Sequence, residues 1–145
     1  MFTVITLFLP TRRTGPAGFS SPVSISRPGA IVAGNVKIGN DSSLQNYTIV
    51  TGYGTPEDLS GLVRIGNGVR IGAHGMIIGG DHRFSDPSMP IHKQGIEPMP
   101  ITICDDVWIG GNVNIIAGVT IGSGSAGPLR QGPCGDPLCH SAHYG

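Results

Sequence analysis

Four isoleucines in the C-terminal half of the chain recur at intervals of six residues: Ile103, Ile109, Ile115 and Ile121. Valines take the fifth place of the first three of these hexads: Val107, Val113 and Val119. The same interval separates two earlier groups: Ile65, Ile71 and Ile77, and Val32, Ile38, Leu44 and Val50. An α-helix buries residues three and four apart. A period of six therefore excludes an amphipathic helix along these segments.

Each hexad joins a short stretch of alternating pattern to a turn such as "IGNG", "IGAH" or "IGGN". Gly and Asn adopt the conformations that a tight corner needs. Three such sides close one triangular coil, and the inward aliphatic residues of successive coils stack on each other. The eleven hexads predict an all-β solenoid of between three and four coils. The alternative is a small β-sandwich, which usually has longer strands and turns every 8–12 residues.

Two segments interrupt the hexads. "GYGTPEDLSG", residues 52–61, is predicted to be a polar insert at a corner, and residues 79–100 are predicted to form a long loop between coils. Long loops in compact domains are usually functional. The longer segment carries many ionisable side chains: Asp81, His82, Arg83, Asp86, His92, Lys93 and Glu97.

Length and composition narrow the class of protein. A chain of 145 residues favours a single domain. The formal net charge is zero and 12% of residues are charged, so nucleic acid and anionic membranes are not the expected partners. The 24 glycines and 12 prolines indicate many turns or disorder, and the 39% share of hydrophobic residues argues against disorder.

The first residues, "MFTVITLFLPTRR", contain an apolar run of eight residues, from Phe2 to Leu9. This run is too short to span a bilayer. It also has no preceding positive charge and no small-residue cleavage site, so it makes a poor signal peptide. The three cysteines are an odd number without a disulfide framework, which favours a reducing compartment. We therefore expect a cytoplasmic protein.

Two ordered motifs, "DHRFSDPSMPIHKQG" and "ITICDDVWIGGNVNIIAGVTIG", closely resemble the hexapeptide-repeat acyltransferases. The most similar branch contains maltose and galactoside O-acetyltransferases and acetyltransferases of surface-polysaccharide synthesis. The resemblance covers about residues 30–125. It implies a left-handed parallel β-helix, an exception to the right-handed crossover rule. It also implies a homotrimer with acetyl-CoA bound between neighbouring subunits. We divide the chain into an N-terminal segment (1–22), the repeat domain (23–125) and an irregular tail (126–145).

His82 matches the catalytic histidine of this family. An alcohol is a poor nucleophile at neutral pH, and imidazole can take its proton as the oxygen attacks the thioester carbonyl. The alternative is an ordinary surface histidine. Trp108 matches a tryptophan that lines the acyl-CoA cleft, although it could also be a partly buried solenoid side chain. Gly110 and Gly111 match a corner whose backbone N–H stabilises the developing oxyanion, although any solenoid corner favours glycine.

The resemblance also indicates candidates for acceptor binding. Asn46, in "LQNYTIV", resembles an asparagine that contacts the acceptor sugar, and a turn or an asparagine ladder is the alternative. Asp81 or Asp86 could orient His82 or bind an acceptor hydroxyl. Phe84 could flank the acceptor or pack the loop down. These matches imply transfer of acetyl from acetyl-CoA to a sugar or polysaccharide precursor without a metal, and they leave oxygen and nitrogen acceptors both open.

Two metal sites are rivals. The γ-type carbonic anhydrases share this solenoid and bind zinc through three histidines. His74, His82 and His92 are numerous enough, but their spacing is not that family's pattern. The tail holds four further candidate ligands: Cys134, Cys139, His140 and His143. Paired zinc ligands usually need a longer chain between the pairs than these positions allow.

The tail, "AGPLRQGPCGDPLCHSAHYG", contains no hexads. The resemblance implies one more coil here, similar to "VVGAGSVVTKDVP". Codons available to "GDPLCHSAHY", read one base later, can encode Val-Thr-Arg-Ser-Val-Thr-Pro-Pro-Ile, which is close to that continuation. We therefore hypothesise a frameshifted tail, which the nucleotide sequence would test. The second functional hypothesis follows: an inactive truncated solenoid that acts only as a structural or interaction module.

Overall fold

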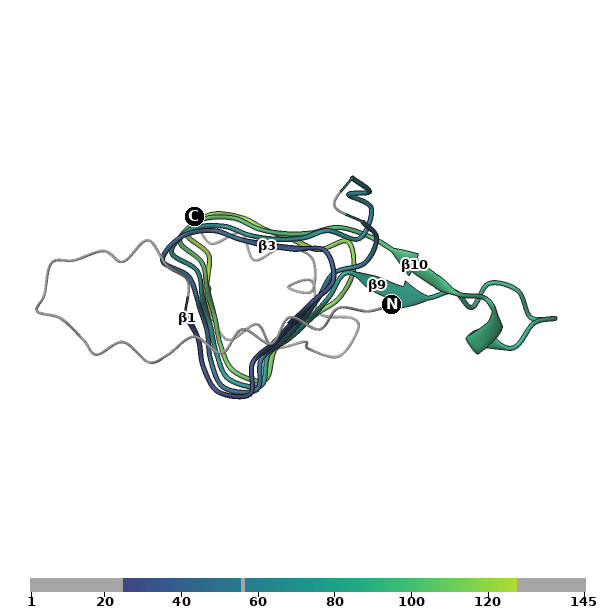
Figure 1. Cartoon of the computed structure of the whole chain (residues 1–145), viewed down its shortest axis with the longest axis horizontal. Helices are drawn as coiled ribbons and strands as arrows, with labels where there is room; N and C mark the ends of the chain where they lie inside the picture. The colour runs from purple at the N-terminus through teal and green to yellow at the C-terminus, as the bar shows by residue number, and fades with distance from the viewer. Residues whose placement is uncertain (1–24, 56, 128–145) are drawn as a thin grey trace, which may run out of the picture.

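The computed structural model describes residues 25–55 and 57–127, and in this part the chain winds into a triangular solenoid (Figure 1). Three parallel sheets form its sides. Side 1 contains β1 (Ile25–Ser26), β4 (Ser43–Leu44), β7 (Arg70–Ile71), β12 (Trp108–Ile109) and β15 (Ala126–Gly127). Side 2 contains β2 (Ile31–Ala33), β5 (Ile49–Thr51), β8 (Met76–Ile78) and β13 (Asn114–Ile115). Side 3 contains β3 (Val36–Ile38), β6 (Val63–Ile65), β11 (Ile101–Ile103) and β14 (Thr120–Ile121).

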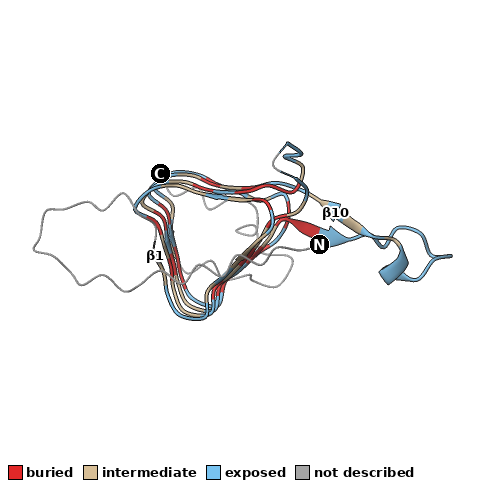
Figure 2. Cartoon of the chain, in the orientation of Figure 1, coloured by how far each residue is buried: buried red, intermediate tan, exposed pale blue. Residues whose placement is uncertain are grey.

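The strand register stacks the aliphatic residues of the hexads. On side 3, Ile65 pairs with Ile38 on one flank and with Ile103 on the other. On side 1, Ile71 lies between Leu44 and Ile109. These side chains belong to the hydrophobic core or pack against it, and Figure 2 shows buried segments in red along the sides of the triangle. The parallel β-helix predicted from the hexads is therefore confirmed, and the sandwich is excluded.

The solenoid continues slightly past the last hexad. β15 pairs with β12, so that Trp108 lies opposite Ala126 and Ile109 opposite Gly127. These two residues fall in the segment that the hexad count assigned to the tail. The rest of the tail, with the proposed frameshift and the candidate ligands Cys134, Cys139, His140 and His143, lies outside the described residues.

The three corners differ. Corner 1 joins side 1 to side 2, corner 2 joins side 2 to side 3, and corner 3 joins side 3 to side 1. In corners 1 and 3 every coil turns through four residues, and the third residue has a positive φ. In corner 1 these residues are Gly29, Tyr47, His74 and Asn112. In corner 3 they are Asp41, Gly68, Asp106 and Gly124. Because positive φ favours Gly, Asn and Asp, the turn composition of the hexads has a direct structural reason.

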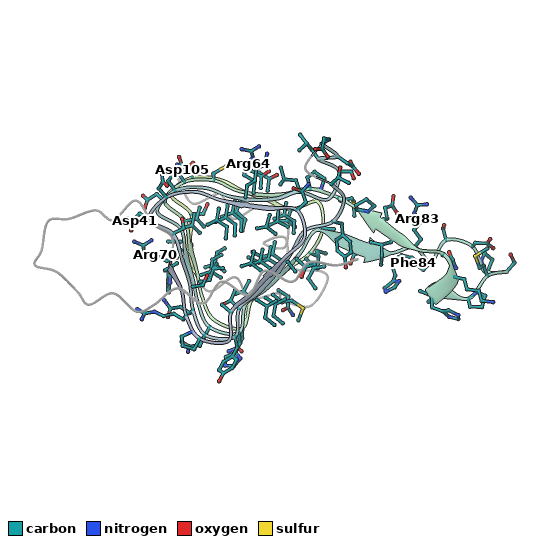
Figure 3. The ribbon with its side chains drawn as sticks, viewed as in Figure 1. Asp41, Arg64, Arg70, Arg83, Phe84 and Asp105 are labelled. Carbon is teal, nitrogen blue, oxygen red and sulfur yellow. The ribbon has the colours of Figure 1, made fainter. Side chains whose placement is uncertain are left out.

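Side-chain hydrogen bonds join neighbouring coils at corner 3. Asn67 Oδ1 accepts a hydrogen bond from the Asn40 amide at 2.8 Å, and Asp105 Oδ1 accepts one from the Asn67 amide at 2.7 Å. Arg70 and Asp41 form an exposed ion pair at 3.3 Å on the same corner (Figure 3). Exposed ion pairs contribute little, so the amide ladder is the more important link.

Both interruptions leave the solenoid at corner 2. Residues 52–62 separate β5 from β6 in one coil, and residues 79–100 separate β8 from β11 in the next. The longer segment is a projecting arm (Figure 1). Its base is a hairpin of β9 (Gly80–His82) and β10 (Ile96–Pro98), and a 3-10 turn, η1 (Ile91–Lys93), lies farther out. The base of the predicted loop is therefore regular antiparallel structure.

In residues 25–55 and 57–127, no helix has the length and hydrophobicity needed to cross a lipid bilayer.

Candidate functional site

A hollow of about 290 Å³ lies where the arm meets the solenoid. Side 2 supplies most of its floor, β9 and β10 supply one wall, and the 52–62 insert supplies Tyr53. The lining residues are Tyr53, Met76, Ile78, Gly80, Asp81, His82, Ile96, Asn114, Ile115 and Ile116. Most of these side chains are apolar, so the few polar groups among them, His82 included, are the candidates for chemistry.

His82 is the last residue of β9 and lines this hollow. In the hairpin it pairs with Ile96, and the next amide, that of Arg83, donates a hydrogen bond to the Gly95 carbonyl at 3.1 Å. The imidazole of His82 is exposed, while the backbone of His82 is paired with the other strand of the hairpin. A general base needs this combination of a fixed position and access to a substrate proton.

The three acidic or aromatic candidates on the arm lie in different environments. Asp81 lines the hollow beside His82. Asp86 accepts hydrogen bonds from the Ser88 hydroxyl at 2.6 Å and from the Ser88 amide at 2.9 Å, and these bonds lower the pKa of its carboxyl. Phe84 is 76% exposed on the arm and is not part of the lining (Figure 3). Of the three, only Asp81 shares the hollow with His82.

The candidates for cofactor binding lie on a different part of the solenoid. Trp108 is on side 1, in register between Arg70 and Ala126, and is 52% exposed. Gly110 and Gly111 begin the next turn of corner 1. The Gly110 amide donates a hydrogen bond to the Gly127 carbonyl at 3.2 Å, and Gly111 is exposed. Of the two amides, that of Gly111 is therefore better placed to meet a ligand.

Asn46 also lies in corner 1, two coils before Gly111. Its carbonyl accepts a hydrogen bond from the His74 amide at 3.0 Å. The adjacent Tyr47 stacks on the His74 ring, with ring centroids 5.3 Å apart. His82 and Asp81 are at corner 2, and the width of side 2 separates them from Trp108, Gly111 and Asn46. A single chain thus carries two groups of candidates on two corners.

The aromatic Tyr53 and the five hydrophobic lining residues are not among the site residues expected from the sequence. The five are Met76, Ile78, Ile96, Ile115 and Ile116. The hexad pattern places Met76 on an outward position, but it gives no signal that Ile96 returns beside His82. That contact depends on the antiparallel register of β9 and β10.

The histidines of the zinc alternative are dispersed. His74 is in corner 1, His82 is at the base of the arm, and His92 is in η1. Within the part of the chain that the structure describes, no three His, Cys, Asp or Glu side chains are grouped so as to hold a metal ion.

Comparisons with known proteins add independent information. The chain is 40% identical over 62 residues to a probable acetyltransferase of Mycobacterium tuberculosis, a match that covers 43% of this chain and 21% of that protein. It is 64% identical over 33 residues to a Saccharomyces cerevisiae protein named as an acetyltransferase, covering 22% of this chain and 17% of that protein. The match therefore spans about a fifth of the length of these curated relatives. No protein-family model matches the chain.

Two solved structures match part of this chain. The first is a hexapeptide-repeat acetyltransferase from Vibrio cholerae in complex with acetyl coenzyme A, with 24% identity and a TM-score of 0.43 over 71% of this chain and 52% of that one. The second is a mutant N-acyltransferase from Bacillus cereus in complex with dTDP and coenzyme A, with 20% identity and a TM-score of 0.45 over 71% of this chain and 68% of that one.

The identity to the curated relatives is found in a chain whose parallel strands pair in register from coil to coil. The chain is therefore similar, over 62 and 33 residues, to proteins named as acetyltransferases.

Proposed function

We propose that this chain transfers an acetyl group from acetyl-CoA to a hydroxyl of a sugar-type acceptor, with His82 as the general base. The observation that carries the proposal is the position of His82. It is fixed on β9 and faces a hollow that the arm and the solenoid form together. The acetyltransferase names of the two curated relatives support the reaction type.

The proposed reaction needs no covalent enzyme intermediate. His82 takes the proton of the acceptor hydroxyl while the acceptor oxygen attacks the thioester carbonyl of acetyl-CoA. The carbonyl π-bond opens to a tetrahedral oxyanion. As the oxyanion collapses, the bond to sulfur breaks, and the CoA sulfur takes the proton from the imidazolium. The products are the acetyl ester and free CoA.

In this proposal the two groups of candidates belong to one site that two copies of the chain build. His82 and Asp81 come from corner 2 of one copy. Trp108 and Gly111 come from side 1 and corner 1 of a neighbour, where Trp108 walls the CoA and the Gly111 amide meets the oxyanion. Side 2 lies between the two corners, and on its outer face Ile31, Ile49 and Met76 are in register.

The outer face of side 2 supports association of copies. Ile31 is 47% and Met76 is 38% exposed, whereas the corresponding outward positions of side 3 are Lys37 and Arg64. An apolar row on one side of a solenoid is a surface that a second copy can cover. We propose a homotrimer, whose threefold symmetry would form three equivalent sites.

The acceptor-binding residues are assigned in the same proposal. Asp81 lines the hollow and can accept a hydrogen bond from an acceptor hydroxyl. Phe84 flanks the acceptor from the arm, and Asn46 reaches it from the neighbouring copy.

The test measures CoA release from acetyl-CoA with a thiol reagent, in the presence of methyl and phenyl glycosides as acceptors. His82→Ala should lower the rate by about 10²–10⁴-fold, the usual contribution of a general base. Because His82 is exposed, the variant should fold like the parent. His92→Ala on the same arm is the matched control and should retain the parent rate.

Calorimetry with CoA provides a second readout. A functional acetyltransferase should bind CoA in both the parent and His82→Ala, whereas an inert solenoid should bind none. Equal rates for the parent and His82→Ala would refute the assignment of the base, and absence of CoA binding would refute the proposed function as a whole.

A further inference from the structure

Tyr53 is the aromatic side chain in the wall of the hollow, and it comes from the 52–62 insert. Two glycines make room for it. A Cβ on Gly80 would lie 2.9 Å from Tyr53 Cδ2, and a Cβ on Gly61 would lie 2.7 Å from Tyr53 Cβ. Such distances are too short for real Cβ contacts, so the ring lies directly against the backbone of β9. β9 also carries His82.

The insert that carries Tyr53 is anchored at both of its ends. The Tyr53 amide donates a hydrogen bond to the Gly61 carbonyl at 2.8 Å, which closes the insert at its base. The buried Asn35 side chain donates to the carbonyls of Thr55 at 2.7 Å and Asp58 at 3.1 Å. A buried side-chain amide needs hydrogen-bond partners, and carbonyls of the insert supply them here. These contacts fix the Tyr53 ring relative to His82.

The chemistry of the wall is suited to an amphipathic ligand. Met76, Ile78, Ile96, Ile115 and Ile116 are apolar, and Asp81, His82 and Asn114 are polar. The Tyr53 hydroxyl makes no hydrogen bond to another residue of the described part of the chain. A phenol can both donate and accept a hydrogen bond, and its ring can pack against the C–H face of a sugar.

We infer that Tyr53 binds the acceptor. Its ring packs on the acceptor, and its hydroxyl hydrogen-bonds to a polar group next to the hydroxyl that His82 deprotonates. The insert at corner 2 therefore helps to select the acceptor, while the arm supplies the base. This inference rests on the proposed function, because it assigns a further residue to the acceptor part of the same site.

The size of the effect follows from the interaction that each variant removes. Tyr53→Phe removes one neutral hydrogen bond and should lower kcat/KM for the acceptor by about 3- to 10-fold. Tyr53→Ala also removes the packing of the ring and should lower kcat/KM by about a further tenfold. Both variants should leave the KM for acetyl-CoA unchanged, because the Trp108 and Gly111 corner is not altered.

The experiment compares the parent, Tyr53→Phe and Tyr53→Ala by CoA release over a panel of methyl and phenyl glycosides. Tyr53→Phe retains the ring and its contacts with Gly61 and Gly80, so it tests the hydroxyl even if Tyr53→Ala fails to fold. Leu59→Ala is the matched control, because it removes an exposed apolar side chain of the same insert that does not line the hollow.

The expected result is a loss confined to the acceptor's kcat/KM in the two Tyr53 variants and parent kinetics in Leu59→Ala. Parent kinetics in both Tyr53 variants would overturn the inference and leave the proposed function intact. If the parent protein transfers acetyl to no glycoside of the panel, the proposed sugar acceptor fails, and the role of Tyr53 fails with it.

Discussion

Corner 1 and corner 2 flank the same sheet, but they are built differently. Each turn of corner 1 has four residues and a third residue with positive φ. In corner 2, two successive turns are replaced by the 52–62 insert and the arm. The chain thus keeps one edge of side 2 uniform and places its longest segments at the other. The regular four-residue turns and the candidate base His82 therefore lie at opposite edges of one sheet.

The two regions also differ in what stabilises them. The coils are held by fully buried aliphatic residues such as Val50, Val63 and Ile103. The arm beyond its hairpin is exposed, and its turn is held by the Gln94 side chain. Gln94 Nε2 donates to the carbonyls of Asp86 at 2.8 Å and Met89 at 2.7 Å. The arm is therefore expected to contribute to function much more than to stability.

The largest expected effect is that of removing the arm. Gly80 and Pro98 are partners in the hairpin, so an Asn-Gly turn can join them directly. The shortened chain should show the circular dichroism of the parent and lose CoA release by about 10²–10⁴-fold, because His82 is removed. Loss of the folded solenoid in this variant would show that the arm and the coils are not separable.

A core substitution should have the opposite outcome. Ile65→Ala deletes a buried side chain of β6 and should lower the free energy of unfolding by about 2–5 kcal/mol. Arg64→Ala, on the exposed face of the same strand, is the matched control and should change it by less than about 0.5 kcal/mol. Denaturant unfolding followed by circular dichroism measures both. Similar values for the two variants would contradict the inward stacking of the hexads.

A smaller effect is expected where the insert is attached to the coils. Asn35→Ala removes two hydrogen bonds to the insert and should lower the free energy of unfolding by about 1–2 kcal/mol. Amide hydrogen exchange should increase in residues 57–61, while the strands of side 1 keep their protection. Lys37→Ala, an exposed change two residues away, is the control. Uniformly increased exchange would mean that the insert is not an independent unit.

The smallest effect concerns the turn of the arm. The Ser88 hydroxyl, and secondarily the Ser88 amide, lower the pKa of Asp86 from its ordinary 3.8. Because the pKa of Asp86 is lowered in the folded protein, its hydrogen bonds with Ser88 stabilise the folded arm above about pH 3.8. This stabilisation is lost as the pH falls through the folded-state pKa. Ser88→Ala should raise the pKa of Asp86 toward 3.8, as measured by NMR titration of the carboxyl carbon.

The insert provides a matched comparison for this titration. The Ser60 amide is the main cause of the lowered pKa of Asp58, with the Ser60 side chain second. Ser60→Ala retains the amide and should therefore shift the Asp58 titration less than Ser88→Ala shifts that of Asp86. The reverse order would show that backbone geometry, and not the hydroxyl, sets the pKa in the arm.

The sequence predicted the coils well because each hexad specifies its own strand and corner. The hexads predict that Ile65 and Ile103 both point inward, and the structure pairs them on side 3. His82 lines the hollow, and its role as the base stays a prediction. The hairpin was not predicted, because β9 and β10 are three residues each and have no hexad pattern.

The sequence also could not predict that the candidate site residues would lie on two separate parts of the solenoid. His82 lies in the first of the two motifs and Trp108 in the second, but the side or corner that each occupies depends on how many residues the inserts add between hexads. Tyr53 was missed for a related reason. Its contact with Gly80 joins residues of two coils, and only the register of the coils brings them together.

The register of side 3 has a further consequence. Ile101 pairs with Val63, so the chain resumes the strand register of side 3 directly after the arm. The entropy of closing a loop grows only with the logarithm of its length, and doubling the loop costs only about 0.6 kcal/mol. Lengthening or exchanging the arm is therefore a mild perturbation of the coils. Corner 2 is a position at which this scaffold can accept a longer or different segment while the register of its coils stays unchanged.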